Sequence, residues 1–138
     1  MWHIVYVASY ATHCTVMSSV NFDNLRLELR RGGLVLAVLA ALHAEQYGYT
    51  LRKIMVDHGI EIDEGTLYPL LRRLESQGLL TSKWREEQKR NKRFYKLTVA
   101  GKQILEQLLN EWRSMDSSIN SILKEYGHAT SRTVLAGR

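Results

Sequence analysis

The chain has 138 residues, enough for one globular domain, and with 45% hydrophobic and 24% charged residues its composition excludes an intrinsically disordered protein. Its formal net charge of +5 favours an anionic partner. The single cysteine excludes an internal disulfide, the scattered histidines have no zinc-site spacing, and no apolar run approaches the roughly 20 residues that cross a bilayer. We therefore expect a cytoplasmic protein with no metal, cofactor, membrane partner or secretory signal peptide.

The N-terminal residues differ from the rest of the chain. Residues 1–16 contain no Lys, Arg, Asp or Glu and precede a second methionine, Met17. Two interpretations are open: a β-like or disordered arm, and upstream sequence translated from a misplaced start codon, which we favour. Residues 1–22 are therefore treated as an N-terminal extension.

Short helices are expected next. Asp23–Arg31 has apolar residues at a period of two, so it is either a strand or a short helix, and we favour a helix that ends at Gly32 and Gly33. Leu34–Glu45 is apolar on all sides, which predicts a buried core helix. Tyr49–His58 is the next predicted helix, with Leu51, Ile54, Met55 and His58 on one face.

The central stretch is Asp63–Leu80. Its leucines at positions 67, 70, 71 and 74 have helical spacing, Asp63 is a suitable N-cap, and Gly78 is a suitable residue to end the helix. We expect Pro69 to bend the helix or tighten its first turn. With the preceding helix and a connector of about four residues, this is the layout of a helix-turn-helix, although an ordinary surface helix has the same pattern. The opposite face carries Thr66, Tyr68, Arg72 and Arg73.

A basic hairpin is predicted to follow. Leu79–Trp84 and Arg93–Thr98 read as two strands joined by a long polar turn. Seven basic and two acidic residues lie between Lys83 and Lys96, so the whole positive excess of the chain falls there. This concentration favours a phosphate-binding element over a merely solvated loop.

The last predicted helix begins at Thr98, its N-cap, and ends at about Tyr126. Its apolar positions repeat in steps of three and four, as in a coiled-coil seam, which favours a homodimer interface. The alternative is packing on the chain's own core, which fits the first half of the helix better than Ile119–Tyr126. Residues 127–138 are expected to be a flexible tail. The expected interface residues are Leu105, Leu108, Trp112, Met115, Ile119, Ile122 and Tyr126.

Several motifs lie along these elements: Tyr47-Gly48-Tyr49, Gly65-Thr66-Leu67-Tyr68-Pro69-Leu70-Leu71, Arg73-Leu74-Glu75, Gly78-Leu79-Leu80, and Phe94-Tyr95-Lys96-Leu97-Thr98 with Gly101. From Leu25 to Leu123 the chain resembles the PadR family of winged-helix transcriptional regulators. It departs from that family in the wing, where Glu87–Lys92 contain neither Gly nor Pro.

The resemblance implies a mainly α fold with a small β-hairpin: a winged helix-turn-helix over residues 23–98 and a C-terminal dimerisation helix over residues 99–126. It also implies a homodimeric repressor, not an enzyme, that binds a palindromic operator in double-stranded DNA and is released by a small aromatic or hydrophobic effector at Trp112, Met115 and Asp116. The alternative is a winged-helix module for protein–protein contact. The expected DNA contacts are Tyr49, Gly65, Thr66, Tyr68, Arg72, Arg73, Lys89, Arg90, Lys92 and Arg93.

Overall fold

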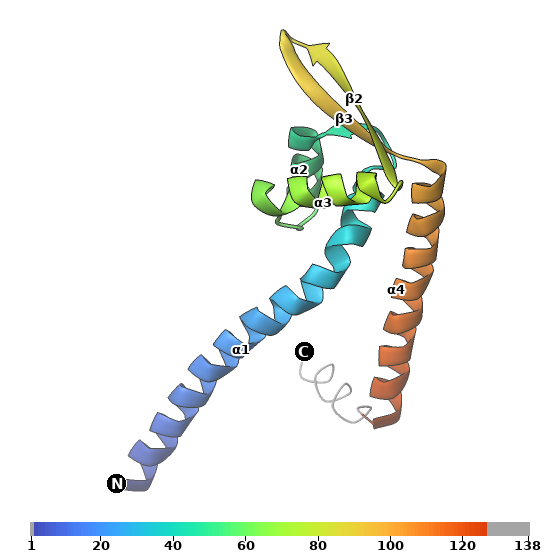
Figure 1. Cartoon of the computed structure of the whole chain (residues 1–138). Helices are drawn as coiled ribbons and strands as arrows, with labels where there is room; N and C mark the ends of the chain where they lie inside the picture. Colours follow the sequence, from blue (N-terminus) through green and yellow to red (C-terminus); the bar gives the residue numbers. More distant parts are fainter. Residues whose placement is uncertain (1, 127–138) are drawn as a thin grey trace. The chain divides into compact units, whose positions relative to one another are not determined.

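The computed structural model describes the backbone of residues 2–126 and the side chains of residues 21–126 (Figure 1). It confirms the predicted fold class of a mainly helical chain with one long hairpin and a long C-terminal helix. None of the described helices is long and apolar enough to span a membrane. The elements are α1 (Trp2–Ala41), β1 (Gln46–Tyr47), α2 (Gly48–Asp57), α3 (Glu64–Ser76), β2 (Leu80–Glu87), β3 (Arg90–Leu97) and α4 (Val99–Tyr126).

The chain divides into two units between Val35 and Leu36. In the first unit, α1 is helical from Trp2 onward, so a β-like arm, which was part of the interpretation that we did not favour, is wrong, as is the expected break at Gly32 and Gly33. No Gly or Pro precedes Gly32, and a helix-interior glycine costs only about 1 kcal/mol, which a long helix tolerates. The preference for a helix over a strand at residues 23–31 is confirmed.

The core of the second unit is formed by the end of α1, by α2 and α3, and by the base of the hairpin. All four leucines of the predicted apolar face of α3 are buried. α2 ends at Asp57, one residue earlier than predicted; His58 is exposed, and its Nδ1 lies 2.8 Å from the carbonyl oxygen of Ile54, one turn earlier on the same face. The buried hydrophobic residues are Val38, Leu39, Leu42, Leu51, Met55, Ile62, Leu67, Leu70, Leu71, Leu74, Leu80, Phe94, Tyr95 and Leu97.

The hairpin is longer than predicted. β2 and β3 are antiparallel and paired from Leu80↔Leu97 out to Glu87↔Arg90, so only Gln88 and Lys89 form the turn, not the long polar loop that the sequence indicated. Both turn residues have positive φ, 53° and 63°, the backbone of a tight two-residue hairpin that usually contains Asn or Gly. β1 pairs with the other edge of β3, which gives the sheet order β1-β3-β2.

The junction between α3 and α4 is closely packed. Thr98 donates from its amide to the Leu79 carbonyl (3.1 Å) and from its hydroxyl to the Gly78 carbonyl (2.6 Å). The same hydroxyl accepts from the Gly101 amide (3.0 Å), which confirms Thr98 as the N-cap of α4. Gly101 is buried, and a Cβ there would overlap the Leu79 carbonyl oxygen. The end of the helix-turn-helix is therefore fixed to the first turn of α4.

Beyond its first three turns, α4 has little cover in the described part of the chain. Leu105 and Leu108 are half-buried, whereas every described residue from Asn110 onward is exposed. The exposed residues include the apolar positions Trp112, Met115, Ile119, Ile122 and Tyr126.

Candidate nucleic-acid interface

The buried apolar face and the N-cap of α3 fix this helix in place and leave its opposite face exposed. Asp63 accepts a hydrogen bond from the Thr66 amide at 2.7 Å, which confirms the predicted N-cap. This bond lowers the pKa of the Asp63 carboxyl, so its negative charge at the start of the helix is retained. The predicted contact residues of α3 are all exposed: Gly65, Thr66, Tyr68, Arg72 and Arg73.

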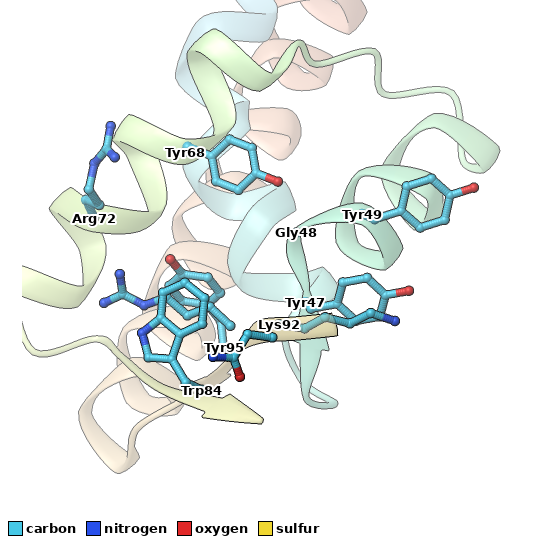
Figure 2. A pocket seen from close by; sticks show the side chains of 10 residues that line it. Tyr47, Gly48, Tyr49, Tyr68, Arg72, Trp84, Lys92 and Tyr95 are labelled. Atoms are coloured by element: carbon cyan, nitrogen blue, oxygen red, sulfur yellow. The ribbon is translucent and has the colours of Figure 1, made fainter. Parts of the chain in front are cut away.

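An open hollow of about 460 Å³ lies between the start of α2, α3 and the hairpin (Figure 2). It brings together predicted contact residues from three elements: Tyr49 of α2, Tyr68 and Arg72 of α3, and Lys92 and Arg93 of β3. Arg73 is not among the lining residues, so the two arginines of α3 are not equivalent. The lining residues are Tyr47, Gly48, Tyr49, Tyr68, Arg72, Trp84, Asn91, Lys92, Arg93 and Tyr95.

The hollow is rich in aromatic rings that the sequence did not place at the site. Tyr47, Trp84 and Tyr95 are brought there by the sheet register, in which Trp84 pairs with Arg93 and Tyr47 with Phe94. Burial raises the pKa of the Tyr95 phenol, which therefore stays neutral at physiological pH. A two-residue strand such as β1 leaves no periodic signal, so the sequence could not place Tyr47.

The start of α2 opens into this hollow. Its N-cap, Tyr47, provides no side-chain hydrogen bond to the first-turn amides. The Tyr68 ring lies against Gly48, where a Cβ would come within 2.5 Å of the phenol oxygen. A free helix N-terminus beside a phenol and the Lys92 ammonium is a favourable environment for a phosphate oxygen.

The cations of the hairpin divide into those that contact acidic or aromatic side chains, described first, and those that have no acidic partner. Arg85 pairs with Glu45 at 2.6 Å and lies over the Phe94 ring, and Lys92 lies 4.4 Å from the centre of the Tyr47 ring. Arg93 pairs with Glu75 at 2.9 Å. Neither of the carboxylates near Arg73 in the sequence is its partner: Glu75 binds Arg93, and the Asp63 carboxylate caps α3.

The other hairpin cations are exposed, and within the described residues they have no acidic partner at ion-pair distance. Lys89 lies in the turn and Arg90 begins β3, so both are at the tip. These residues are Lys83, Lys89, Arg90 and Lys96.

The predicted effector residues lie on α4, away from the hollow's lining. Trp112, Met115 and Asp116 are all exposed in the single chain. Among the described residues there is no cluster of three or more potential metal ligands.

Comparisons with known proteins agree with this geometry. The model of the family described as "Transcriptional regulator PadR-like family" matches residues 35–107. The chain is 33% identical over 102 residues to the transcriptional regulator Rv3488 of Mycobacterium tuberculosis, covering 73% of this chain and 92% of that protein.

Solved structures are similar as well. A PadR family transcriptional regulator from Eggerthella lenta is 42% identical with a TM-score of 0.70, over 73% of this chain and 90% of that one. Bacillus subtilis PadR in complex with operator DNA is 28% identical with a TM-score of 0.51, over 55% of this chain and 46% of that one.

Proposed function

Because the chain belongs to the PadR-like family of transcriptional regulators, we propose that it represses transcription as a homodimer on a palindromic operator and that a small aromatic or hydrophobic effector releases it. The observation that carries the proposal is the hollow: it joins the exposed face of α3, the free start of α2 and the hairpin in one cationic surface. The complex of Bacillus subtilis PadR with operator DNA supports a DNA partner.

In this proposal α3 enters the major groove. Thr66, Tyr68 and the first-turn amides of α2 bind backbone phosphates and set the register. Arg72 and Arg73 point outward from the helix that reads the bases, and an arginine is the side chain best suited to a guanine edge. Lys89 and Arg90 at the hairpin tip bind phosphates of the neighbouring backbone, because no acidic residue described in the chain neutralises them.

Selection of bound fragments from genomic DNA tests this function. A dimer with two α3 helices predicts enriched sequences with inverted half-sites about 10 base pairs apart, or a multiple of that. A winged-helix module used only for protein contact would enrich no sequence. Adding planar aromatic compounds to the selected complex then tests the effector: release by such a compound should be lost in Trp112→Leu, which removes the aromatic ring but keeps a large apolar side chain at this position of the seam, so that DNA binding is kept.

We expect Gly48→Ala to weaken operator binding about tenfold while leaving the fold nearly unchanged. The new Cβ would meet the Tyr68 ring, which can swing away because it is the end of an exposed side chain, and Tyr68 would then lose its place beside the start of α2. Fluorescence anisotropy with the selected operator measures the change.

The matched control for this prediction is the same substitution in a Tyr68→Ala background. There the Cβ has no ring to displace, so Gly48→Ala should have almost no further effect. An equal loss of affinity in both backgrounds would show that Gly48 does not act through Tyr68.

A further inference from the structure

Arg93 differs from the other hairpin cations in its contacts. Its Nε donates to the Ser82 hydroxyl at 2.8 Å, and its Nη2 donates to Glu75 Oε2 at 2.9 Å. The Ser82 hydroxyl in turn donates to Glu75 Oε1 at 2.6 Å. The three side chains therefore form a closed ring of hydrogen bonds in which both carboxylate oxygens are used.

The ring joins the C-terminal end of α3 to the two strands of the hairpin, which are already paired with each other along their length. Glu75 is in the last turns of α3, Ser82 is near the base of β2, and Arg93 is on β3, opposite Trp84. The Arg93 guanidinium also lies within 6 Å of the centres of the Trp84 and Tyr95 rings, 5.8 Å and 5.4 Å away. A planar guanidinium with bonds to two partners has a fixed orientation, which a lysine ammonium would not have.

Because the ring of Glu75, Ser82 and Arg93 lies near the base of the hairpin, a small change of angle there moves the hairpin tip by a larger distance. From Ser82 to the turn at Gln88 the hairpin extends about 20 Å at the usual strand rise of about 3.3 Å per residue, so a tilt of about 10° would displace the tip by about 3.5 Å. That displacement exceeds the tolerance of a hydrogen bond to a phosphate. The angle between α3 and the hairpin therefore decides whether the tip and α3 can bind one half-site together.

We propose that Arg93 is a positioning residue: with Glu75 and Ser82 it sets the angle of the hairpin to α3, and it acts on DNA through the tip residues Lys89 and Arg90, not through a phosphate of its own. This inference rests on the proposed DNA binding. The charge of the Arg93 guanidinium is already balanced by Glu75, and only about a third of the Arg93 side chain is exposed.

Two conservative substitutions separate the positioning role from a direct phosphate contact. Arg93→Lys keeps the charge but replaces the planar guanidinium with a single ammonium, which cannot hold Ser82 and Glu75 in the same fixed geometry, so it should lower operator affinity about tenfold; a phosphate contact would be largely preserved. Glu75→Gln should also lower affinity, although it removes a negative charge. If Arg93 bound a phosphate, freeing it from Glu75 would raise affinity. Glu86→Gln, the same charge change at an exposed hairpin residue outside the ring, is the control.

The background of Lys89→Ala/Arg90→Ala shows whether Arg93 acts through the tip. We expect Arg93→Lys to have no further effect there. The proposal would be overturned if Arg93→Lys left operator affinity unchanged in the otherwise native protein, or if it lowered affinity equally in both backgrounds. It would also be overturned if Glu75→Gln raised affinity more than Glu86→Gln does.

Amide hydrogen exchange keeps this test separate from that of the function. Arg93→Lys and Glu75→Gln should speed exchange at the amides of β2 and β3 relative to Glu86→Gln, with or without DNA. If the native protein bound no operator, the proposed function would fail while this result could still stand. Native exchange rates in both variants would show that the ring does not hold the hairpin.

Discussion

Replacing Ile119 and Ile122 with glutamate is expected to convert the protein to a monomer and to weaken operator binding by about 10²- to 10⁴-fold. In the single chain the two side chains are 50% and 58% exposed, and both belong to the three-four repeat of α4. Burial of such a ridge gains roughly 25 cal/mol per Å², which a second copy of the same helix can provide.

The loss of affinity follows because the dimer joins two DNA-binding α3 helices in one molecule. In a dimer the second α3 binds its half-site at the high effective concentration set by the first, and a monomer loses that gain. Sedimentation velocity gives the oligomeric state, and fluorescence anisotropy with the selected operator gives the affinity, at one protein concentration.

The matched control is Ser117→Glu/Ser121→Glu, which adds the same two charges to exposed positions on the opposite side of α4. We expect it to remain a dimer and to bind normally. A glutamate variant at positions 119 and 122 that stayed dimeric, or that bound operator as tightly as the native protein, would refute the role of α4.

The second large effect is expected at Gly101. Replacing this glycine with alanine should destabilise the protein by about 3 kcal/mol, because the new Cβ would overlap the carbonyl oxygen of Leu79. The obstacle is backbone, and that carbonyl also accepts a hydrogen bond from the Thr98 amide, so it cannot move without breaking this bond. Urea unfolding at a fixed protein concentration measures the change.

Gly32→Ala is the control for Gly101→Ala. Gly32 is also a helical glycine, but nothing lies within 4 Å of its Cβ position. Alanine there should be neutral or stabilising by about 1 kcal/mol, since it improves helix propensity. Equal stabilities of the two variants would mean that the junction between α3 and α4 is looser than the structure shows.

The sequence predicted the features that depend on local signals. The leucine spacing of α3, its Asp63 cap and the Thr98 cap of α4 are each set by residues within one or two turns, and all three are confirmed. The turn of the hairpin was missed because Gln88 and Lys89 take the positive φ that Asn or Gly usually supplies.

The other features that the sequence did not predict depend on residues far apart in the chain. The ion pair of Arg93 with Glu75 joins positions 18 residues apart, and the aromatic lining of the hollow depends on the register of a strand of only two residues. Charge counting therefore grouped Arg93 with the free cations of the hairpin. The roles of the individual contact residues on DNA stay predictions.

The salt dependence of operator binding is the sharpest test of whether a dimer binds DNA through α3 and the cationic hairpin tip. If the dimer neutralises about 6–10 phosphates, native affinity should fall about 10³- to 10⁵-fold between 50 and 200 mM salt. Lys89→Ala/Arg90→Ala removes four tip charges per dimer and should reduce the slope of log K against log salt by about 3 to 4, with sequence preference kept.

Lys102→Ala/Lys124→Ala removes the same charge from exposed positions of α4 and should leave the slope as in the native protein. We expect a steep slope for the native protein and a flatter slope for the tip variant alone. No duplex binding at 50 mM salt, or the same slope in the tip variant as in the native protein, would contradict it.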